Sequence, residues 1–448
     1  MIMPERGVMR RVWNTATAVL VSGILCGACL LIPEARILAQ GLILSQGAEA
    51  IGADAWHEAG FDGTGVKVAV WDFGFYGYKE LLGSELPSAE RVTARGFGMP
   101  PEGSPEDYPE DAAHGTAVAE IVYDIAPGAT FYLVATDTDA DAIEALDWLI
   151  DEDVDVIVAS ISVDGFCLDA GSSVFEPAFE RLRAAGALLI AASGNDGLSH
   201  WQGLFIDTDG DGLHEFAPGD EGIDVELRAG DFLDVILQWD NPCRPSPNDY
   251  ILRLVDSRGR AVFESDYANN LDGPYEDLYD EVSKNGTCQI QIEKYSGSAV
   301  LLDLVWVNGP EFEYAMRTGS VGYFEPAVSP KVMTVGAINW KTFELESTSS
   351  GGPTKDGRIK PDIVAPTCVV TETYGGRSSE HIEYECGFEG TSAAAPHVGG
   401  AAALVMQAFP ELDADQVQAY LEDNVVDMGE PGKDNVYGSG RLLLPPPP

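Results

Sequence analysis

The chain has 448 residues, with 26 Lys and Arg against 73 Asp and Glu, which gives a formal net charge of −47 at pH 7. That length fits one large domain with an insertion, or two to three ordinary domains. An apolar share of 45% with 22% charged residues argues against disorder. The acidic balance repels phosphate backbones and anionic lipid surfaces, so we expect neither nucleic acid nor a membrane surface as a partner.

The first 39 residues have the pattern of an export segment. Several arginines precede an apolar run from Ala18 to Ile32, which is typical of a signal peptide and shorter than a membrane-spanning helix. We expect cleavage after Ala28 or Ala39 and an extracellular protein. The alternative is an uncleaved membrane anchor that begins near Val12.

Short apolar runs alternate with helical patterns over residues 40–206 and again over 311–443. The runs are continuous and rich in β-branched residues, which is typical of parallel strands buried on both faces. Helical patterns lie between them, as at Asp141–Glu152 and Ser172–Ala185, and a helix rich in small residues is expected from Ser392 to Phe409. We therefore predict an α/β layered domain with a mostly parallel sheet flanked by helices. The expected strands are Val66–Asp72, Phe131–Thr136, Asp155–Ser162, Ala187–Ser193, Lys331–Ile338 and Lys360–Pro366.

The pattern changes over residues 221–310, which interrupt the α/β region. Apolar and polar residues alternate there with period two, and Gly, Asn and Asp turns separate the runs, which predicts antiparallel strands. We expect an inserted antiparallel β-sandwich that either binds substrate or surface glycan, or has a structural role only. The chain ends in a Pro-rich tail at 444–448.

An acidic loop is expected at residues 207–220, between these two patterns. Its alternating aspartates with Gly212 in sixth place match the first half of an EF-hand calcium loop. Pro218 stands where the twelfth-position Glu would be, so the full EF-hand motif is absent. We expect a structural Ca²⁺ here and no organic cofactor; the alternative is an ordinary acidic turn. The expected ligands are Asp207, Asp209, Asp211 and Glu215.

Two of the seven cysteines lie in the first 39 residues, so five remain beyond the export segment. Export permits disulfides, and an odd number leaves at least one cysteine unpaired within the chain. From proximity within each module we expect Cys243 to pair with Cys288 and Cys368 with Cys386, which leaves Cys167 reduced.

Four polar residues stand at positions where α/β sheets place their sites. Asp72 ends an apolar strand, Asn195 follows another, and His114 precedes a helical pattern. Ser392 lies on a Gly-Thr turn before the small-residue helix, where the positive end of the helix would stabilise an oxyanion. Each residue alone is equally typical of a helix cap or turn. Pro396 fits this helix if it falls in the first turn.

The order Asp72, His114, Ser392 is one of the chain orders known for a Ser-His-Asp triad. With these residues in this order, the chain resembles the subtilisin-like serine proteases (subtilases, peptidase S8). The resemblance rests on the segments GTGVKVAVWDFGF, HGTAVAEIVYDIAPGA, DVIVASIS, LLIAASGND, SPKVMTVGAIN, SSGGPTKDGRIKPDIVAP and GTSAAAPHVGG.

The resemblance implies Ser392 as nucleophile, His114 as general base, Asp72 as the residue that orients it, and Asn195 as an oxyanion donor. It also implies a substrate pocket lined by Ser160, Ile161, Ser162, Ala192, Ser193 and Gly194.

We therefore expect a secreted, monomeric serine endopeptidase that acts on proteins or peptides. Two alternatives remain. One is a catalytically silent surface-binding protein on a protease fold. The other is an acyl transferase of the same fold that forms peptide bonds.

Overall fold

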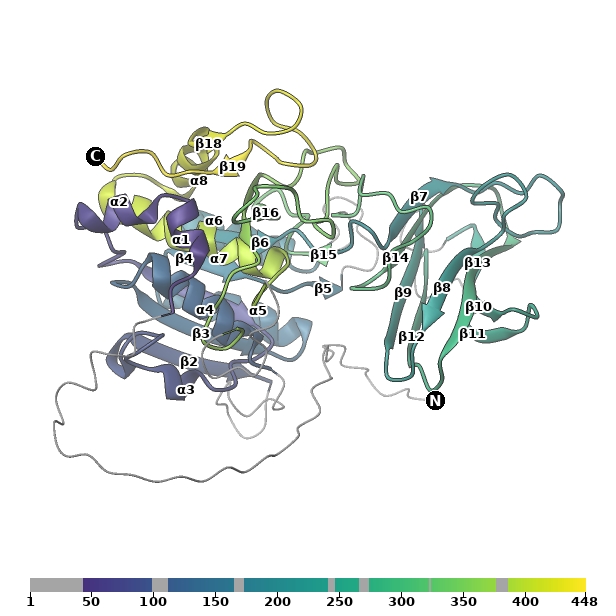
Figure 1. The fold of residues 1–448 in the computed structure, drawn as a ribbon, viewed down its shortest axis with the longest axis horizontal. Coiled ribbons are helices and arrows are strands. Elements are labelled where there is room, and N and C mark those ends of the chain that lie inside the picture. Colours follow the sequence, from purple (N-terminus) through teal and green to yellow (C-terminus); the bar gives the residue numbers. More distant parts are fainter. Residues whose placement is uncertain are drawn as a thin grey trace, which may run out of the picture.

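The computed structural model describes residues 43–98, 112–164, 173–240, 246–265, 274–321, 324–375 and 386–448. The expected export segment, Cys167 and Cys243 lie outside these residues. Two regions stand side by side (Figure 1). We call the described residues of 43–199 and 307–448 the body, and those of 200–306 the insert.

The body is built on one nine-stranded sheet, in the order β18-β19-β17-β16-β6-β4-β1-β3-β2. Neighbouring strands pair in parallel except β18 with β19. The strands are β1 (Lys67–Asp72), β2 (Val92–Phe97), β3 (Thr130–Thr136), β4 (Val156–Ala159), β6 (Leu188–Ala192), β16 (Met333–Asn339), β17 (Ile363–Thr367), β18 (Val425–Val426) and β19 (Arg441–Leu442). A separate short pair joins β5 (Val163–Asp164) to β15 (Phe324–Glu325).

Helices cover both faces of this sheet (Figure 1). Helices α4 (His114–Ile125) and α7 (Thr391–Ala408) share one apolar core, and α5 (Asp139–Asp151) and α6 (Glu176–Ala185) share another. Strand β1 contributes Val68 and Val70 to the first core, and Ala69 and Trp71 to the second. Successive side chains point to opposite faces of a strand, so a strand covered on both sides must be apolar throughout.

The remaining helices lie near the ends of the body or in its connections. They are α1 (Gln46–Ala50), α2 (Ala53–Glu58), α3 (Tyr78–Leu81), the 3₁₀ helix η1 (Ala89–Arg91) and α8 (Ala414–Asp423). The expected strands and helices of the body are present, with ends displaced by a few residues. Helix α6 shows the largest displacement, because it begins at Glu176 with a proline in its first turn.

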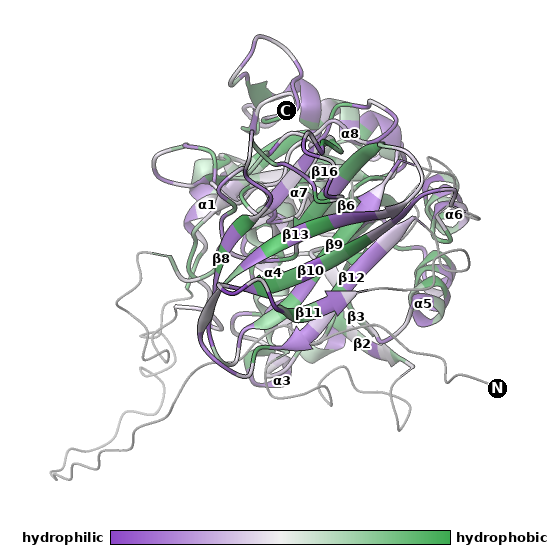
Figure 2. Cartoon of the chain, turned by 90° about the vertical axis from the view of Figure 1, so that its right-hand side faces the viewer, coloured by the Kyte–Doolittle hydropathy of each residue, from purple (hydrophilic) through white to green (hydrophobic). Residues whose placement is uncertain are grey.

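The insert consists of two four-stranded antiparallel sheets, in the orders β11-β10-β13-β8 and β12-β9-β14-β7. Buried and exposed residues alternate along β8, which is the period-two pattern expected from the sequence. Figure 2 shows this mixture of apolar and polar residues along the strands of the insert. The buried residues of both sheets form one apolar core. The strands are β7 (His200–Leu204), β8 (Ile223–Leu227), β9 (Phe232–Trp239), β10 (Asp249–Asp256), β11 (Ala261–Ser265), β12 (Tyr275–Glu281), β13 (Gly286–Ser296) and β14 (Leu301–Trp306).

The two ends of the insert lie together. The Trp306 N–H donates to the Ser199 carbonyl oxygen at 2.9 Å, and β7 pairs with β14 along its length. The sequence analysis assigned residues 200–206 to the α/β region, whereas β7 is an edge strand of the insert. The chain therefore leaves and re-enters the body at one place.

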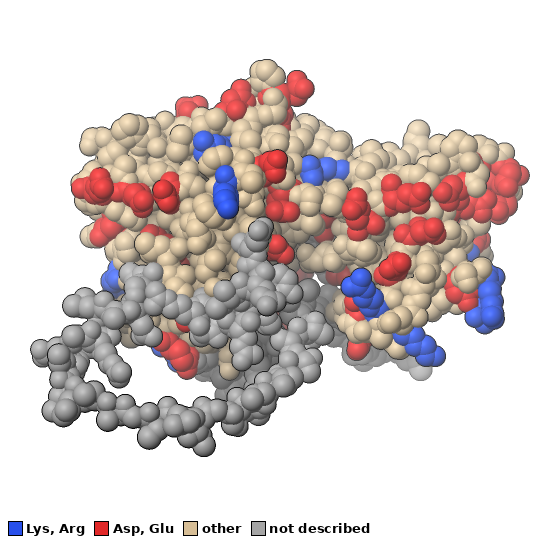
Figure 3. Space-filling view, in the orientation of Figure 1, with Lys and Arg blue, Asp and Glu red and all other residues tan. Residues whose placement is uncertain are grey.

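The face of the molecule drawn in Figure 3 carries acidic side chains on both the body and the insert, with fewer basic ones among them. In the part of the chain that the structure describes, no helix combines the length and apolar character that a membrane crossing requires.

The cysteines follow the expected pairing only in part. Cys368 and Cys386 form a disulfide, with Cα atoms 4.4 Å apart. The expected Cys243–Cys288 pair was wrong, because Cys288 is free and buried. Strand β13 turns this side chain into the apolar core of the insert, where a thiol packs as a small apolar group.

Candidate active site

Asp72 ends strand β1 at the carboxyl edge of the parallel sheet. Its side chain is fully buried, so its carboxylate must find donors within the protein. The carboxylate accepts the N–H of Phe73 at 2.8 Å and contacts the His114 ring. Burial and this backbone bond hold the carboxylate in one orientation.

His114 is the first residue of helix α4. Its Nδ1 atom lies 3.0 Å from Asp72 Oδ1 and 2.9 Å from Oδ2, and 19% of its side chain is exposed. A Cβ on Gly115 would lie 2.7 Å from Asp72 Cβ, so glycine lets the helix begin directly against the end of β1. Burial lowers the pKa of His114, but the charge of Asp72 and the hydrogen bond to it act in the opposite direction, and the net pKa is raised.

Ser392 is the second residue of helix α7, where helix N–H groups lack intrahelical partners. Its hydroxyl donates to the Ser160 carbonyl at 3.2 Å, and the Ser160 hydroxyl donates to the Ser392 carbonyl at 2.9 Å. Pro396 explains the second bond. The condition under which Pro396 fits a helix, a place in the first turn, is not met, because it is the sixth residue of α7. It lacks the N–H that would bond the carbonyl four residues earlier, which is that of Ser392.

Asn195 lies just beyond β6 and is fixed to the start of α7. Its Oδ1 atom accepts the Thr391 N–H at 2.9 Å and the Thr391 hydroxyl at 3.0 Å. A Cβ on Gly390 would lie 2.9 Å from the same oxygen, and Gly390 has a φ of +86°. Glycine therefore permits this close approach. Because Oδ1 is occupied by Thr391, the amide nitrogen is the end left to serve as a donor to a ligand.

The structure thus gathers four sequence segments that are far apart in the chain. Asp72 contacts His114, Asn195 contacts the residue before Ser392, and the ring of Phe388 contacts the His114 ring with centroids 5.3 Å apart. Helices α4 and α7 pack directly against each other.

The comparisons with known proteins agree with this arrangement. The model of the subtilase family matches residues 63–218 and 307–440. The chain belongs to the subtilase family. The matched residues are those of the body together with the segment through the acidic loop, and most of the insert lies outside the match.

Curated relatives share parts of this subtilase chain. Serine protease AprX of Bacillus subtilis (strain 168) is 30% identical over 178 residues, which are 37% of this chain and 38% of that protein. Minor extracellular protease Vpr of the same organism is 22% identical over 436 residues, which are 88% of this chain and 52% of that protein. The chain spans about half or less of the length of these relatives.

Among solved structures, the Clostridium perfringens CspB protease has a TM-score of 0.63 and 18% identity, and the alignment covers 89% of this chain and 97% of that one. The body therefore has the subtilisin-like fold, with its mostly parallel sheet between helices.

The expected substrate-lining residues of this subtilase follow two neighbouring strands, β4 and β6. Most of them, namely Ser160, Ile161, Ala192 and Ser193, are buried, whereas Ser162 and Gly194 are partly exposed. The Ser193 hydroxyl donates to the Ser350 carbonyl at 3.3 Å, and the Gly194 N–H donates to Thr391 Oγ1 at 3.2 Å. The two segments are therefore held against the start of α7.

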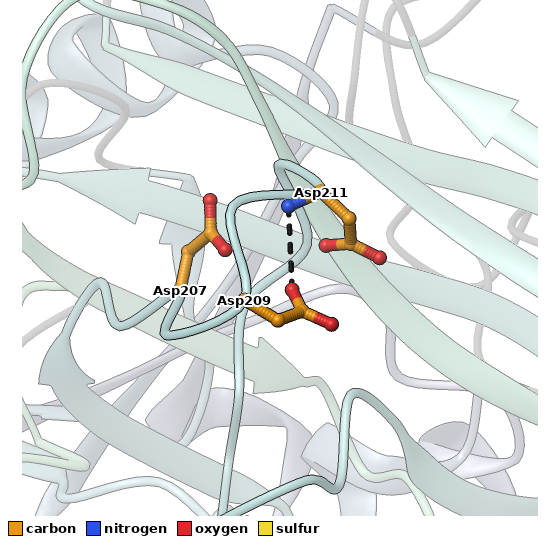
Figure 4. Close-up of side chains that lie close together, drawn as sticks. All are labelled: Asp207, Asp209 and Asp211. Carbon is orange, nitrogen blue, oxygen red and sulfur yellow. Dashed lines mark hydrogen bonds between the residues drawn. The ribbon is translucent and has the colours of Figure 1, made fainter.

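The acidic loop brings three of its four expected ligands together. Carboxylate oxygens of Asp207, Asp209 and Asp211 lie within 4.8 Å of one another, and Figure 4 shows the three side chains around one turn of the loop. Glu215 does not join them. Its buried carboxylate accepts the N–H and hydroxyl of Thr208 and the N–H of Gly219, so it closes the loop from inside.

The sequence analysis did not identify two contacts of this site, Thr391 with Asn195 and Phe388 with His114. Phe388 and Thr391 both stand in the segment GFEGTS, which also carries Ser392. This motif was the signal that could have identified the two residues. The sequence analysis also did not single out Glu120 and Asp124 of α4. Burial is the largest cause that raises the pKa of Glu120 to about 7 and that of Asp124 to about 8.

Proposed function

We propose that the protein is a secreted serine endopeptidase that hydrolyses peptide bonds of proteins or peptides. The observation that carries the proposal is the bonded Asp72–His114 pair at the start of α4, together with Ser392 at the N-terminus of α7, the helix that packs against α4. Relatives named as proteases, two of them as serine proteases and two of them as extracellular, support this reading.

Each group has a distinct role in this mechanism. Nδ1–H of His114 donates to Asp72, which fixes the tautomer that leaves Nε2 as a base. The Ser392 hydroxyl rotates from the Ser160 carbonyl toward Nε2, gives up its proton there, and attacks the substrate carbonyl carbon. The protonated imidazole then donates this proton to the leaving amine. A water molecule then attacks the acyl-enzyme, with His114 again accepting the proton. This step releases the acid product and restores the Ser392 hydroxyl.

The negative charge that forms on the carbonyl oxygen requires donors. We propose that Asn195 Nδ2 supplies one and that the backbone N–H of Ser392 supplies another, assisted by the positive end of α7. The bonds from Thr391 to Asn195 Oδ1 support this assignment, because they orient the amide before substrate arrives. The segments 160–162 and 192–194 would line the substrate pocket on either side.

We also propose that the acidic loop binds a structural Ca²⁺. The donor set fits, because Ca²⁺ prefers carboxylate oxygens in flexible geometry. Backbone N–H groups of Gly210 and Gly212 hold the carboxylate of Asp207 inside the turn. The pKa of the neighbouring Glu221 is raised by burial and then by the charges of Asp211 and Asp209. Those uncompensated charges are what a divalent cation would neutralise.

An organophosphonate probe tests the catalytic proposal directly. We expect an adduct on Ser392 by peptide mapping, and none in Ser392→Ala. A protein without an adduct and without hydrolysis of casein would instead be the silent binding protein. Product analysis with an added amine separates the other alternative, since an acyl transferase would form amide products in preference to free acid.

A further inference from the structure

Phe388 contacts the His114 ring, and the proposed mechanism gives this contact no role. The two rings meet edge to face, with centroids 5.3 Å apart and planes at 83°, which is a favourable geometry for aromatic groups. Phe388 is only 6% exposed. Asp72 thus holds one ring nitrogen of His114 while Phe388 restricts how far the ring can swing.

Phe388 is itself fixed where two chain segments are joined by a backbone bridge and a disulfide. We call these joined residues, 368–369 and 386–388, the neck. The Phe388 N–H donates to the Val369 carbonyl at 2.7 Å, and its carbonyl accepts the Val369 N–H at 3.0 Å. The Cys368–Cys386 disulfide lies beside this bridge. The disulfide and the backbone bridge together tie the segment that carries Phe388 to the segment that follows β17.

A second ring holds Phe388 from the other direction. Tyr374 stacks on it, with centroids 5.2 Å apart and planes at 21°. The turn that carries Tyr374 is bound to helix α4, because the buried Glu120 carboxylate accepts the N–H groups of Glu372 and Thr373 and the Thr373 hydroxyl. The chain of contacts from His114 through Phe388 and Tyr374 therefore returns to the helix on which His114 stands.

We propose that Phe388 is a positioning residue for His114 and that the Cys368–Cys386 disulfide makes this positioning sensitive to dithiols. The inference rests on the proposed function for its kinetic consequence. A dithiol would attack the disulfide, form a mixed disulfide and then its own cyclic disulfide. Two electrons and two protons pass to the protein, leaving Cys368 and Cys386 as thiols. The covalent tie between the two segments of the neck is then lost, and the backbone bridge between Val369 and Phe388 remains.

Kinetics of matched variants separate positioning from substrate contact. Phe388→Leu keeps an apolar side chain but removes the ring, and we expect kcat to fall about threefold to tenfold with KM nearly unchanged. Phe388→Tyr should restore kcat. Phe409→Leu is the control, because Phe409 also packs against a tyrosine, Tyr420, but beyond the far end of α7. A rise in KM with kcat unchanged would show instead that Phe388 contacts substrate.

The disulfide is tested in the same assay. Dithiothreitol should lower kcat of the wild-type protein toward that of the Cys368→Ser/Cys386→Ser double variant, and should leave the double variant unchanged. Circular dichroism verifies that each variant is folded. If Phe388→Leu does not fold, Tyr374→Leu removes the outer ring and is expected to lower kcat in the same direction. An unchanged kcat in the double variant overturns the role of the disulfide.

Proton NMR gives a readout that does not depend on activity. In Ser392→Ala protein, the low-field Nδ1–H resonance of His114 is assigned by its loss in His114→Gln. We expect Phe388→Leu, and separately reduction, to broaden this resonance, because a mobile ring exchanges its proton with water faster. A resonance that stays equally sharp in both overturns the inference. A wild-type protein without Ser392-dependent hydrolysis overturns the proposed function and leaves this NMR test intact.

Discussion

The body and the insert build their cores by the same alternation of side chains but distribute polar groups differently. In the body, segments that are 42 and 196 residues apart bring Asp72 to His114 and Asn195 to Thr391 at one edge of the sheet. The insert instead joins two sheets through an apolar core. The family match covers residues 63–218 and 307–440 and leaves out 219–306. The proposed chemistry therefore lies in the body, and most of the insert lies outside the family match.

The two regions meet next to the proposed oxyanion donor. Asp196 follows Asn195, and its buried carboxylate accepts the Asn308 N–H at 3.1 Å, just beyond the last strand of the insert. Its own N–H donates to Ser350 Oγ at 3.0 Å. Burial is the largest cause that raises the pKa of Asp196 to about 6. The attachment of the insert is thus one residue from a proposed catalytic group.

The largest effects should come from the body. Ser392→Ala and His114→Ala are each expected to abolish peptide hydrolysis while the melting temperature stays near that of the wild type, since the triad members act as a unit and Ser392 loses only a hydroxyl. Casein hydrolysis and calorimetry check this. Most of the activity surviving in either variant would refute the triad assignment.

Activity should also depend on pH through the body. Protonated His114 cannot accept the Ser392 proton, so kcat/KM should fall on the acid side, by about tenfold per pH unit well below the pKa. Because the pKa of His114 is raised from its ordinary 6.5, the midpoint should lie above 6.5. A pH profile of kcat/KM measures it. A midpoint well below 6.5 would contradict the pairing with Asp72.

A change in the core of the insert should affect stability and leave the chemistry alone. Leu252 is fully buried there, and Leu252→Ala should lower the free energy of unfolding by about 2–5 kcal/mol through the cavity it leaves. Denaturant unfolding measures the loss, and kcat at low temperature is the control. A large fall in kcat without a loss of stability would show that the two regions are coupled.

The smallest effect concerns the acidic loop, which follows β7 within the insert. Ca²⁺ at a hundred times its dissociation constant should stabilise the fold by about 2.7 kcal/mol, so EDTA should lower the melting temperature and Asp209→Ala should blunt that response. Mg²⁺ should substitute poorly, because it requires a compact octahedral site. Ionic strength is matched with NaCl. A melting curve indifferent to both EDTA and calcium would identify an ordinary acidic turn.

Most of the body could be predicted from the sequence because strands buried on both faces need continuous apolar runs, which are easily recognised. Residues Val68–Trp71 of β1 are apolar at every position, which is the pattern that a strand covered on both faces requires. The residues proposed for catalysis could be found because they stand in ordered motifs. The GFEGTS segment marked Phe388 and Thr391 as residues near the site, but not their partners, because these contacts depend on how the segment folds back against α4 and β6.

Other details of the structure depend on side-chain direction, which spacing in the sequence does not give. Cys288 was paired by proximity in sequence, but its position on β13 directs it into an apolar core. Glu215 was grouped with the aspartates by composition, yet its side chain turns inward to Thr208. The position of Pro396 depended on where α7 begins, and the sequence alone could not fix that residue.

The hydrogen bond between Trp306 and Ser199 has a consequence for the modularity of the molecule. Since the chain departs from and rejoins the body at adjacent points, the whole of 200–306 is topologically equivalent to one long surface loop, and the closure entropy of such loops grows only slowly with length. Experiments that replace the insert with another segment can therefore use this point as the boundary between body and insert. A short turn, or a foreign domain whose termini lie equally close, could take the place of the insert without changing the strand order of the nine-stranded sheet.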